Sequence, residues 1–260
     1  MKSRAFTAAV LSYALVLVGA CTSNQQDDQE IRIGLFSPFS GSTASFGMQL
    51  KKGVEFAVQE RNSKGGIGGK KILLISEDDR GESGEAQNAV TKLITQHHVV
   101  AILGNATSSG TLAGAPVSQH YRIPMITPTA TNPRVTEIGD CIFRVCWIDT
   151  FQGEVMATFA LARLNIKNVS ILYDVSSDYS VGLKEVFVRE FQSQGGRILK
   201  VKSYSAGDTD FSAPANGCKG RSTECRLYPR LLHRSRFDYP AGPTVGNRVD
   251  PDGYGWLGCA

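Results

Sequence analysis

Between residues 31 and 213 the chain alternates short apolar runs with longer amphipathic stretches. The apolar runs are rich in Val, Ile and Leu with little polar alternation, which is typical of strands buried on both faces of a parallel sheet. The amphipathic stretches repeat their apolar residues at helical spacing, as between Met48 and Val58. The pattern predicts strands at residues 31–36, 72–75, 99–103, 124–127, 142–145, 169–173 and 198–204. It predicts helices at residues 48–58, 83–97, 110–120, 151–164 and 181–194.

This alternation predicts an α/β fold of two lobes, each with a doubly wound parallel sheet. The turn-rich segment 127–133 interrupts the pattern, which restarts after Asp149 with strand–helix units of its own. We therefore expect a first lobe at residues 31–149 and a second lobe at residues 150–213. In open parallel sheets the loops at the carboxyl ends of the strands line the ligand crevice. These loops are predicted at residues 37–46, 105–110, 127–131 and 174–180.

The N-terminus has the layout of a secretory signal. Two basic residues precede an uncharged apolar run at 5–19, which is shorter than the length that a helix needs to span a bilayer. The run closes on Val18-Gly19-Ala20-Cys21 and turns polar at once, which resembles a bacterial lipoprotein signal. This interpretation gives a signal peptide at 1–20, a tether at 21–30 and a lipid on the Cys21 thiol. The alternative is a plain signal peptide with an incidental cysteine, and either interpretation puts the protein outside the cytoplasm.

Composition and charge exclude several classes of function. The chain has 260 residues, of which 42% are hydrophobic and 20% charged, as in an ordinary globular protein. Residues 1–213 hold 21 Lys and Arg against 20 Asp and Glu, so the body lacks the basic excess that nucleic-acid binding needs. We expect no nucleic-acid partner.

The predicted strand-end loops are rich in Ser, Thr and Gly and almost lack acid–base groups. The segment 104–110 follows a strand and opens a helix, but it is neither a nucleophile elbow nor a phosphate loop with its lysine. His97-His98 is interpreted as the end of a helix, where a positive charge interacts favourably with the helix dipole, rather than as a metal site. The acidic run Glu77-Asp78-Asp79 is interpreted as a turn cap rather than a cation site. We therefore expect no catalysis, no cofactor and no metal.

Hydroxyls and free amides gather instead at one predicted helix start. Ser108, Ser109 and the loop 127–131 offer such groups. Helix N-terminal N–H groups point at an anion and the dipole favours it, so this set suits a carboxylate without any cationic side chain. The alternative is that Ser108 only caps its helix, and position alone does not choose between the two.

Four motifs occur in an order that resembles a known family. They are Gly-Ser-Thr-Ala-Ser-Phe-Gly at 41–47, Arg-Asn-Ser-Lys-Gly-Gly-Ile-Gly-Gly at 61–69, Ile-Thr-Pro-Thr-Ala-Thr-Asn-Pro at 126–133 and Phe-Arg-Val-Cys-Trp-Ile-Asp-Thr-Phe-Gln-Gly at 143–153. Over residues 31–213 the chain is similar to the leucine/isoleucine/valine-binding group of type I periplasmic binding proteins. These are the ligand receptors of ABC importers.

The resemblance implies an amino acid held in a cleft between the lobes, its α-carboxylate fixed by the first lobe. By matching motif, Ser108 donates its hydroxyl and amide, Thr129 uses its backbone and Thr131 uses its hydroxyl. Phe46 covers the ligand side chain, although core packing is its alternative. Tyr179 supplies an aromatic group from the second lobe, and its strand-end loop favours exposure.

The implied partners are an amino acid, an inner-membrane ABC permease and, through the anchor, a membrane surface. Branched-chain amino acids are the favoured ligands, although members of the family bind other amino acids, amides or urea. A sensory module of the same fold and, more remotely, an enzyme on a doubly wound sheet are the rival functions. A sensory module would need a downstream signalling segment, and the enzyme would need the missing catalytic groups.

Residues 214–260 do not continue the pattern. They contain no isoleucine but three of the six cysteines and five of the ten prolines. A tail or disulfide module is one interpretation, and a shifted reading frame is the other. Reading each codon one base later permits family-like strings, for example Ile-Pro-Gly-Tyr-Tyr-Thr-Glu-Val across 228–236. We favour the shifted frame.

A shifted frame has consequences for the second lobe. It leaves this lobe incomplete, with a sheet edge and apolar faces unpaired. It also removes the tyrosine segment and the acidic group with which the family grips the ligand's ammonium group. We therefore expect binding by this copy to be impaired.

Overall fold

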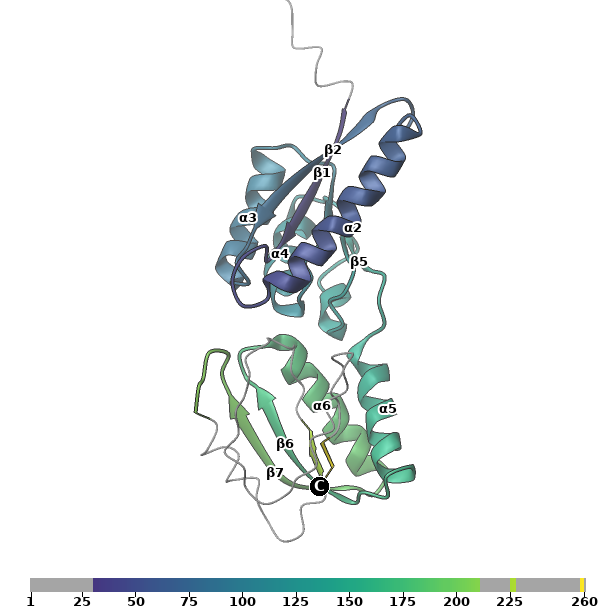
Figure 1. Cartoon of the computed structure of the whole chain (residues 1–260), viewed down its shortest axis with the longest axis vertical. Coiled ribbons are helices and arrows are strands. Elements are labelled where there is room, and N and C mark those ends of the chain that lie inside the picture. Colours follow the sequence, from purple (N-terminus) through teal and green to yellow (C-terminus); the bar gives the residue numbers. More distant parts are fainter. Residues whose placement is uncertain (1–29, 211–224, 228–257, 260) are drawn as a thin grey trace, which may run out of the picture.

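The computed structural model describes residues 30–210, 225–227 and 258–259. Two α/β bodies, each with its own sheet, follow one another along the long axis of the molecule (Figure 1). The expected signal peptide, most of the tether with Cys21, and most of the segment 214–260 lie outside the described residues.

The first sheet has five strands in the order β2-β1-β3-β4-β5, and every neighbouring pair is parallel. Its strands are β1 (Glu30–Ser37), β2 (Lys71–Asp78), β3 (Ala101–Leu103), β4 (Met125–Thr127) and β5 (Ile142–Arg144). Because all the strands run the same way, their carboxyl ends meet at one edge. That edge faces the second lobe (Figure 1).

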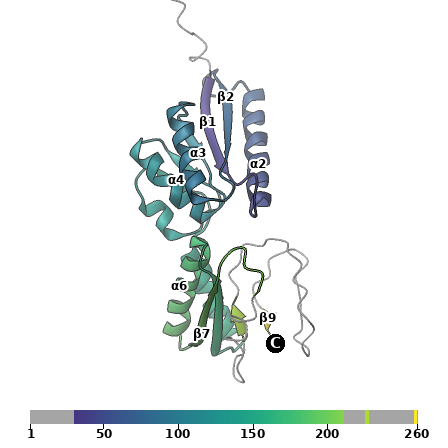
Figure 2. The same ribbon diagram turned by 90° about the vertical axis from the view of Figure 1, so that its left-hand side faces the viewer.

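Helices cover both faces of the first sheet. Helix α2 (Ala44–Ser63) lies on one face, and α3 (Ser83–Thr95) and α4 (Ser108–His120) lie together on the other (Figure 2). The main core fills the space between the sheet and α3 and α4. Its largest buried side chains include Phe36, Leu93, Ile102 and Met125.

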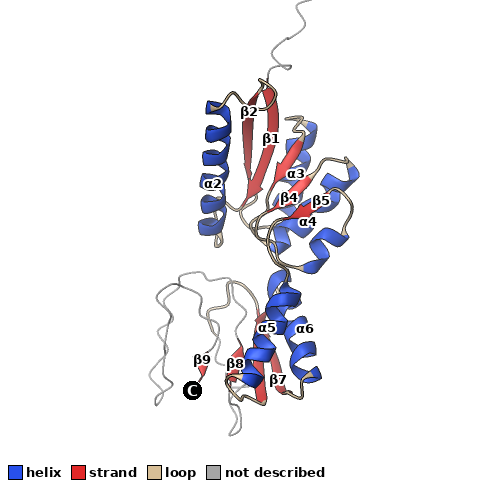
Figure 3. Cartoon of the chain, turned by 90° about the vertical axis from the view of Figure 1, so that its right-hand side faces the viewer, coloured by secondary structure: helices blue, strands red, loops and turns tan. Residues whose placement is uncertain are grey.

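The second lobe packs two helices against a smaller sheet (Figure 3). Its main elements are α5 (Asp149–Ala162), β6 (Asn168–Asp174), α6 (Asp178–Ser193) and β7 (Arg197–Tyr204). The sheet order is β7-β6-β8-β9, with β6 parallel to both of its neighbours. Phe187 and Phe191 stack at 5.2 Å in its core.

The α/β fold with parallel sheets is confirmed, and several details differ from the predictions. A 3-10 helix, η3 (Pro133–Glu137), follows the expected turn-rich segment. Helices α4 and α6 begin earlier than predicted because capping residues precede them. The second-lobe sheet, expected to have an unpaired edge, continues past β6 with β8 (Cys225–Leu227), and β9 (Gly258–Cys259) runs antiparallel to β8.

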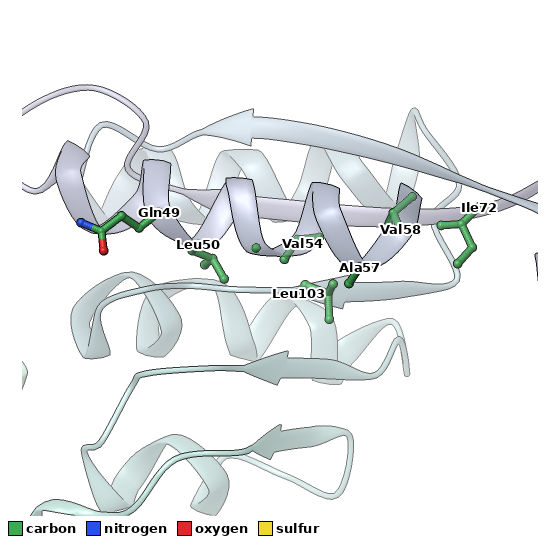
Figure 4. Close-up of a pocket in the computed structure, with 8 residues that line it drawn as sticks. Gln49, Leu50, Val54, Ala57, Val58, Ile72 and Leu103 are labelled. Atoms are coloured by element: carbon green, nitrogen blue, oxygen red, sulfur yellow. The ribbon is translucent and has the colours of Figure 1, made fainter. Parts of the chain in front are cut away.

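A hollow of about 340 Å³ lies between α2 and the sheet (Figure 4). Its lining is almost wholly apolar, with Leu50 and Val54 on the helix and Leu103 on the sheet. It runs along the sheet face beneath the helix and not at the carboxyl ends of the strands. Gln49 is the one polar side chain among its lining residues, and no charged side chain lines it, so this hollow is poorly suited to a charged ligand.

Candidate functional site

The loops after three neighbouring strands, β1, β3 and β4, are joined by hydrogen bonds. The Ser37 hydroxyl at the end of β1 accepts from the Ala106 N–H at 3.3 Å. After β4, the Thr129 hydroxyl donates to the Ala106 carbonyl oxygen at 2.7 Å, and the Thr127 hydroxyl donates to that of Asn105 at 2.8 Å. The three loops therefore form one fixed polar surface at the strand ends.

Ser108 is the first residue of α4, and Thr107 is the residue that caps the helix. The Thr107 hydroxyl accepts from the Gly110 N–H at 3.1 Å. The Ser108 side chain is only 3% exposed, and its hydroxyl accepts from the Asn132 N–H at 3.3 Å. The capping alternative for Ser108 is therefore wrong. A hydroxyl that accepts here keeps its own hydrogen for donation to another group.

Free amides accompany this hydroxyl. In the described part of the chain, no hydrogen bond engages the backbone N–H of Ser108 or of Ser109. Thr131 is buried, and its carbonyl oxygen accepts from the Asp149 N–H at 2.9 Å. The predicted first-lobe residues Ser108, Thr129 and Thr131 thus lie on one surface. Its donors at a helix start suit an anion.

Asp79 and Asn105 form a buried hydrogen-bonded pair next to this surface, which the sequence did not predict. The Asn105 amide donates to the carboxylate of Asp79, whose other oxygen accepts from the Gly81 N–H at 2.8 Å. The Asn105 amide oxygen accepts from the Thr107 N–H at 2.9 Å. Burial raises the pKa of Asp79 to about 6, partly offset by these hydrogen bonds. The pair holds the loop that leads into α4.

Phe46 lies in the first turn of α2 and is 36% exposed. The loop before it is held by Asp78, whose carboxylate accepts from the Phe39 N–H at 2.8 Å and from the Ser40 hydroxyl at 2.6 Å. Burial alone would raise the pKa of Asp78, but the hydrogen bonds to its carboxylate together lower the pKa by more, so it lies below its ordinary value. Gly47 permits the close approach, because a Cβ there would lie 2.0 Å from the Pro38 carbonyl oxygen.

These contacts confirm the turn-cap interpretation of the acidic run for its aspartates. Glu77 differs, because it pairs with Lys92 at 2.9 Å and lies 3.4 Å from the His97 ring. His97 therefore meets a carboxylate after α3 has ended at Thr95, rather than lying in the last turn of the helix.

Tyr179 lies in the first turn of α6 and not in a loop, because Ser177 caps the helix through the Ser180 N–H. The tyrosine is half-buried, so the predicted exposure is wrong. Its hydroxyl accepts from the Gln152 side-chain amide at 3.3 Å, and burial raises its pKa. Among the described contacts, no hydrogen bond joins Phe46 or Tyr179 to the first-lobe hydroxyls.

Asp149, the first residue of α5, is fully buried at the junction of the lobes. Within residues 30–210, neither of its carboxylate oxygens has a hydrogen-bond partner in good geometry. Burial raises its pKa to about 6, and the nearby Thr131 hydroxyl and Arg144 guanidinium offset this only in part. Arg144 is committed elsewhere, since it donates to the carbonyl oxygens of Ala130 and Asn132 at 2.9 Å.

The described residues contain no group of three or more His, Cys, Asp or Glu side chains that could hold a metal ion. In the same part of the chain, no helix combines the length and the apolar character needed to cross a membrane.

Comparison with known proteins gives consistent matches. A family described as periplasmic binding protein matches residues 30–220. An amino acid binding protein of Pseudomonas aeruginosa is 31% identical over 246 residues, which cover 94% of this chain and 63% of that protein. A Leu/Ile/Val-binding protein homologue of Brucella melitensis is 34% identical over 196 residues, covering 75% of this chain and 53% of that protein.

Solved structures agree. A leucine-binding protein from Thermotoga maritima matches with a TM-score of 0.67 and 38% identity, over 72% of this chain and 52% of that one. A branched-chain amino acid transporter substrate-binding protein from Streptococcus pneumoniae, in complex with isoleucine, matches with a TM-score of 0.70 and 35% identity. That match covers 76% of this chain and 56% of the other. The chain thus spans little more than half the length of most of these relatives.

Proposed function

Since the chain belongs to the periplasmic binding protein family, we propose that it is the substrate-binding protein of an ABC importer and not an enzyme. It binds an amino acid in the cleft between its lobes and presents the closed form to a membrane permease. The observation that carries this proposal is the start of α4, where Ser108 combines a buried hydroxyl with an unengaged amide.

The α-carboxylate is the part of the ligand that this surface suits. A carboxylate gains from charge-assisted hydrogen bonds, and the partial positive charge of a helix start adds to them. Ser108 donates from its hydroxyl and amide, Thr129 from its backbone and Thr131 from its hydroxyl. No cationic side chain is required, because the helix start and the hydroxyls supply the donors.

A branched-chain side chain is the favoured ligand feature. Relatives are named as Leu/Ile/Val-binding proteins, and one solved neighbour is in complex with isoleucine. Phe46 provides apolar area from the first lobe and Tyr179 provides it from the second. Both are suited to cover an aliphatic side chain.

The site works outside the cytoplasm, at the periplasm or the cell-envelope exterior, on a lipid anchor at Cys21. Cys21→Ser should abolish incorporation of labelled fatty acid and release the protein from the membrane fraction. Unchanged labelling would refute the anchor. A plain signal peptide predicts no labelling in either protein.

The shifted frame after about Ser212 lowers affinity in this copy. The second lobe then lacks the groups with which the family binds the ligand's ammonium group. Most of the binding therefore comes from the first lobe and the carboxylate. A frame-restored chain, extended to the length of its relatives, should bind L-leucine at least 100-fold more tightly, because leaving one member of a buried charge pair unpaired costs about 3–5 kcal/mol.

The proposal is tested by titration calorimetry with L-leucine, L-isoleucine and L-valine on the frame-restored chain. Ser108→Ala should cost about 1–3 kcal/mol of binding, since a buried anion loses a hydrogen bond. Ser118→Ala is the matched control. It removes a buried hydroxyl from the same helix, where Ser118 donates to the Ile123 carbonyl oxygen at 2.8 Å. Equal affinities for the parent and Ser108→Ala would remove Ser108 from the site.

A further inference from the structure

Helix α6 touches the first lobe through the backbone of its first residue, Asp178. The Asp178 N–H donates to the Ser109 hydroxyl at 3.0 Å. The Asp178 carbonyl oxygen accepts from the Asn132 side-chain amide at 2.8 Å. Two first-lobe side chains therefore hold both polar backbone atoms of one second-lobe residue, at the end of α6 that faces the first lobe (Figure 1).

The contact with Ser109 meets a need of the helix itself. The first N–H groups of a helix have no partner within it. In α6 the Ser177 side chain accepts from the Ser180 N–H, so the Asp178 N–H needs an acceptor from outside the helix. Ser109 supplies that acceptor from 69 residues away.

Asn132 connects this contact to the proposed ligand site. Its backbone N–H donates to the Ser108 hydroxyl at 3.3 Å, and its side-chain oxygen accepts from the Arg134 N–H at 3.0 Å. Its carbonyl oxygen accepts from Arg144 at 2.9 Å. The side chain is 3% exposed, so every polar group of Asn132 is engaged in one fixed orientation.

Gly182 makes room for this arrangement one turn into α6. A Cβ at Gly182 would lie 2.8 Å from the Asn132 side-chain nitrogen, closer than real Cβ atoms come. Glycine within a helix costs about 1 kcal/mol relative to alanine. The local helix therefore gains nothing from glycine here, whereas the contact with Asn132 requires it.

We infer that Ser109 and Asn132 clamp the Asp178 backbone and so position α6 of the second lobe against the first. Tyr179 follows Asp178 directly, and Asn132 also touches the Ser108 hydroxyl. The clamp therefore sets where the second-lobe aromatic group lies relative to the first-lobe carboxylate site. This consequence for the ligand rests on the proposed function, whereas the clamp itself does not.

The test is amide hydrogen exchange, followed by NMR on the full chain without ligand. Ser109→Ala should speed exchange of the Asp178 amide about tenfold relative to the Leu183 amide in the same helix, as a protecting acceptor is lost. Ser109→Thr keeps the hydroxyl and should restore protection. Ser118→Ala removes a buried hydroxyl from the far end of the same helix, where it donates to Ile123, and should leave the Asp178 amide as it is.

Two further variants separate the clamp from general stability. Asn132→Asp keeps the size and the acceptor for the Arg134 N–H but turns an acceptor toward the Asp178 carbonyl oxygen. Gly182→Ala favours the helix but displaces Asn132. Both should speed exchange of the Asp178 amide while the circular dichroism of the chain is unchanged. An Asp178 amide that exchanges at the parental rate in Ser109→Ala and Asn132→Asp would overturn the clamp.

Titration of the same samples with L-leucine keeps the two proposals apart. If the clamp positions Tyr179, Asn132→Asp should weaken leucine binding at least fivefold. Absence of leucine binding by the parent would count against the proposed function of this copy. The ligand-free exchange rates would still decide the clamp.

Discussion

The two lobes contribute to the molecule in unequal ways. The first has five parallel strands between helices on both faces, and three adjacent strand ends carry its polar surface. The second has two long strands, two short ones and a smaller core, and its described hydrogen bonds to the first lobe come from the first residues of α5 and α6. The first lobe therefore supplies most of the polar groups of the candidate site, and in our proposal the second lobe mainly supplies orientation.

The reason lies in how each lobe supports its polar groups. In the first lobe, Phe36 packs beneath the loop at Gly104 and against Gly114 of α4, so the core directly supports the start of α4. In the second lobe, Phe187 and Phe191 lie away from the first turn of α6. A loss in the first core should reach the site, whereas a loss in the second should stay local.

The largest effects are expected from opening a cavity in each core. Phe36→Ala and Phe191→Ala should each cost about 3–5 kcal/mol of the unfolding free energy of their own lobe. Only Phe36→Ala should also shift the Ser108 amide resonance, because it alone lies beneath the loop before α4. Urea denaturation followed by circular dichroism measures the stability, and NMR measures the shift.

A matched response would contradict this comparison. If Phe191→Ala shifts the Ser108 amide as strongly as Phe36→Ala does, the two lobes form one cooperative unit. The assignment of chemistry to the first lobe alone would then fail.

The next effect concerns two buried carboxylates with different surroundings. Burial raises the pKa of both Asp79 and Asp149 to about 6, from an ordinary value of 3.8. The folded state therefore binds the proton more tightly than the unfolded state. The stability that each protonated group contributes is present below about pH 4 and is lost as the pH rises through about 6.

Asparagine replacements should separate the two carboxylates. Asp149→Asn should raise the melting temperature at pH 7 and flatten its dependence on pH between 4 and 6, because an unpartnered buried charge is removed. Asp79→Asn should instead lower stability at pH 7 by about 1–3 kcal/mol, since its new amide hydrogens face the donors on Gly81 and Asn105. Melting curves from pH 4 to 8 measure both, and equal responses would contradict the contrast.

The smallest effects are expected from the two helix caps. Thr107→Ala and Ser177→Ala each remove a side-chain acceptor from a first-turn amide and should cost about 0.5–2 kcal/mol. Thr107→Ala should lie at the upper end, because the Thr107 hydroxyl also lies 3.1 Å from the Asn105 amide oxygen. Chemical denaturation measures both costs. A larger cost for Ser177→Ala would reverse the ranking of the lobes.

The sequence was sufficient for the strands and for locating the first-lobe half of the candidate site, whose ligand role stays a prediction. Buried strands are continuous apolar runs, and the segment before α4 follows such a run, so Ser108 could be found from pattern and motif together. Tyr179 was misplaced because the prediction started α6 at Val181. Ser177, a good capping residue, signals the earlier start.

The contacts that join distant segments were not predictable in this way. Asp79 and Asn105 are 26 residues apart, and Ser109 and Asp178 are 69 apart. Neither pair produces a periodic pattern in the sequence, because each contact depends on how one whole element is positioned against another. Only the packed fold brings such groups together.

In our proposal the start of α4 receives the ligand's carboxylate, and NMR on the full chain with L-leucine can detect this contact. We expect the Ser108 and Ser109 backbone amide resonances to shift together and saturably, with L-leucinamide, which lacks the carboxylate, producing no such shift. Saturable leucine binding that leaves both amides unchanged would contradict the account.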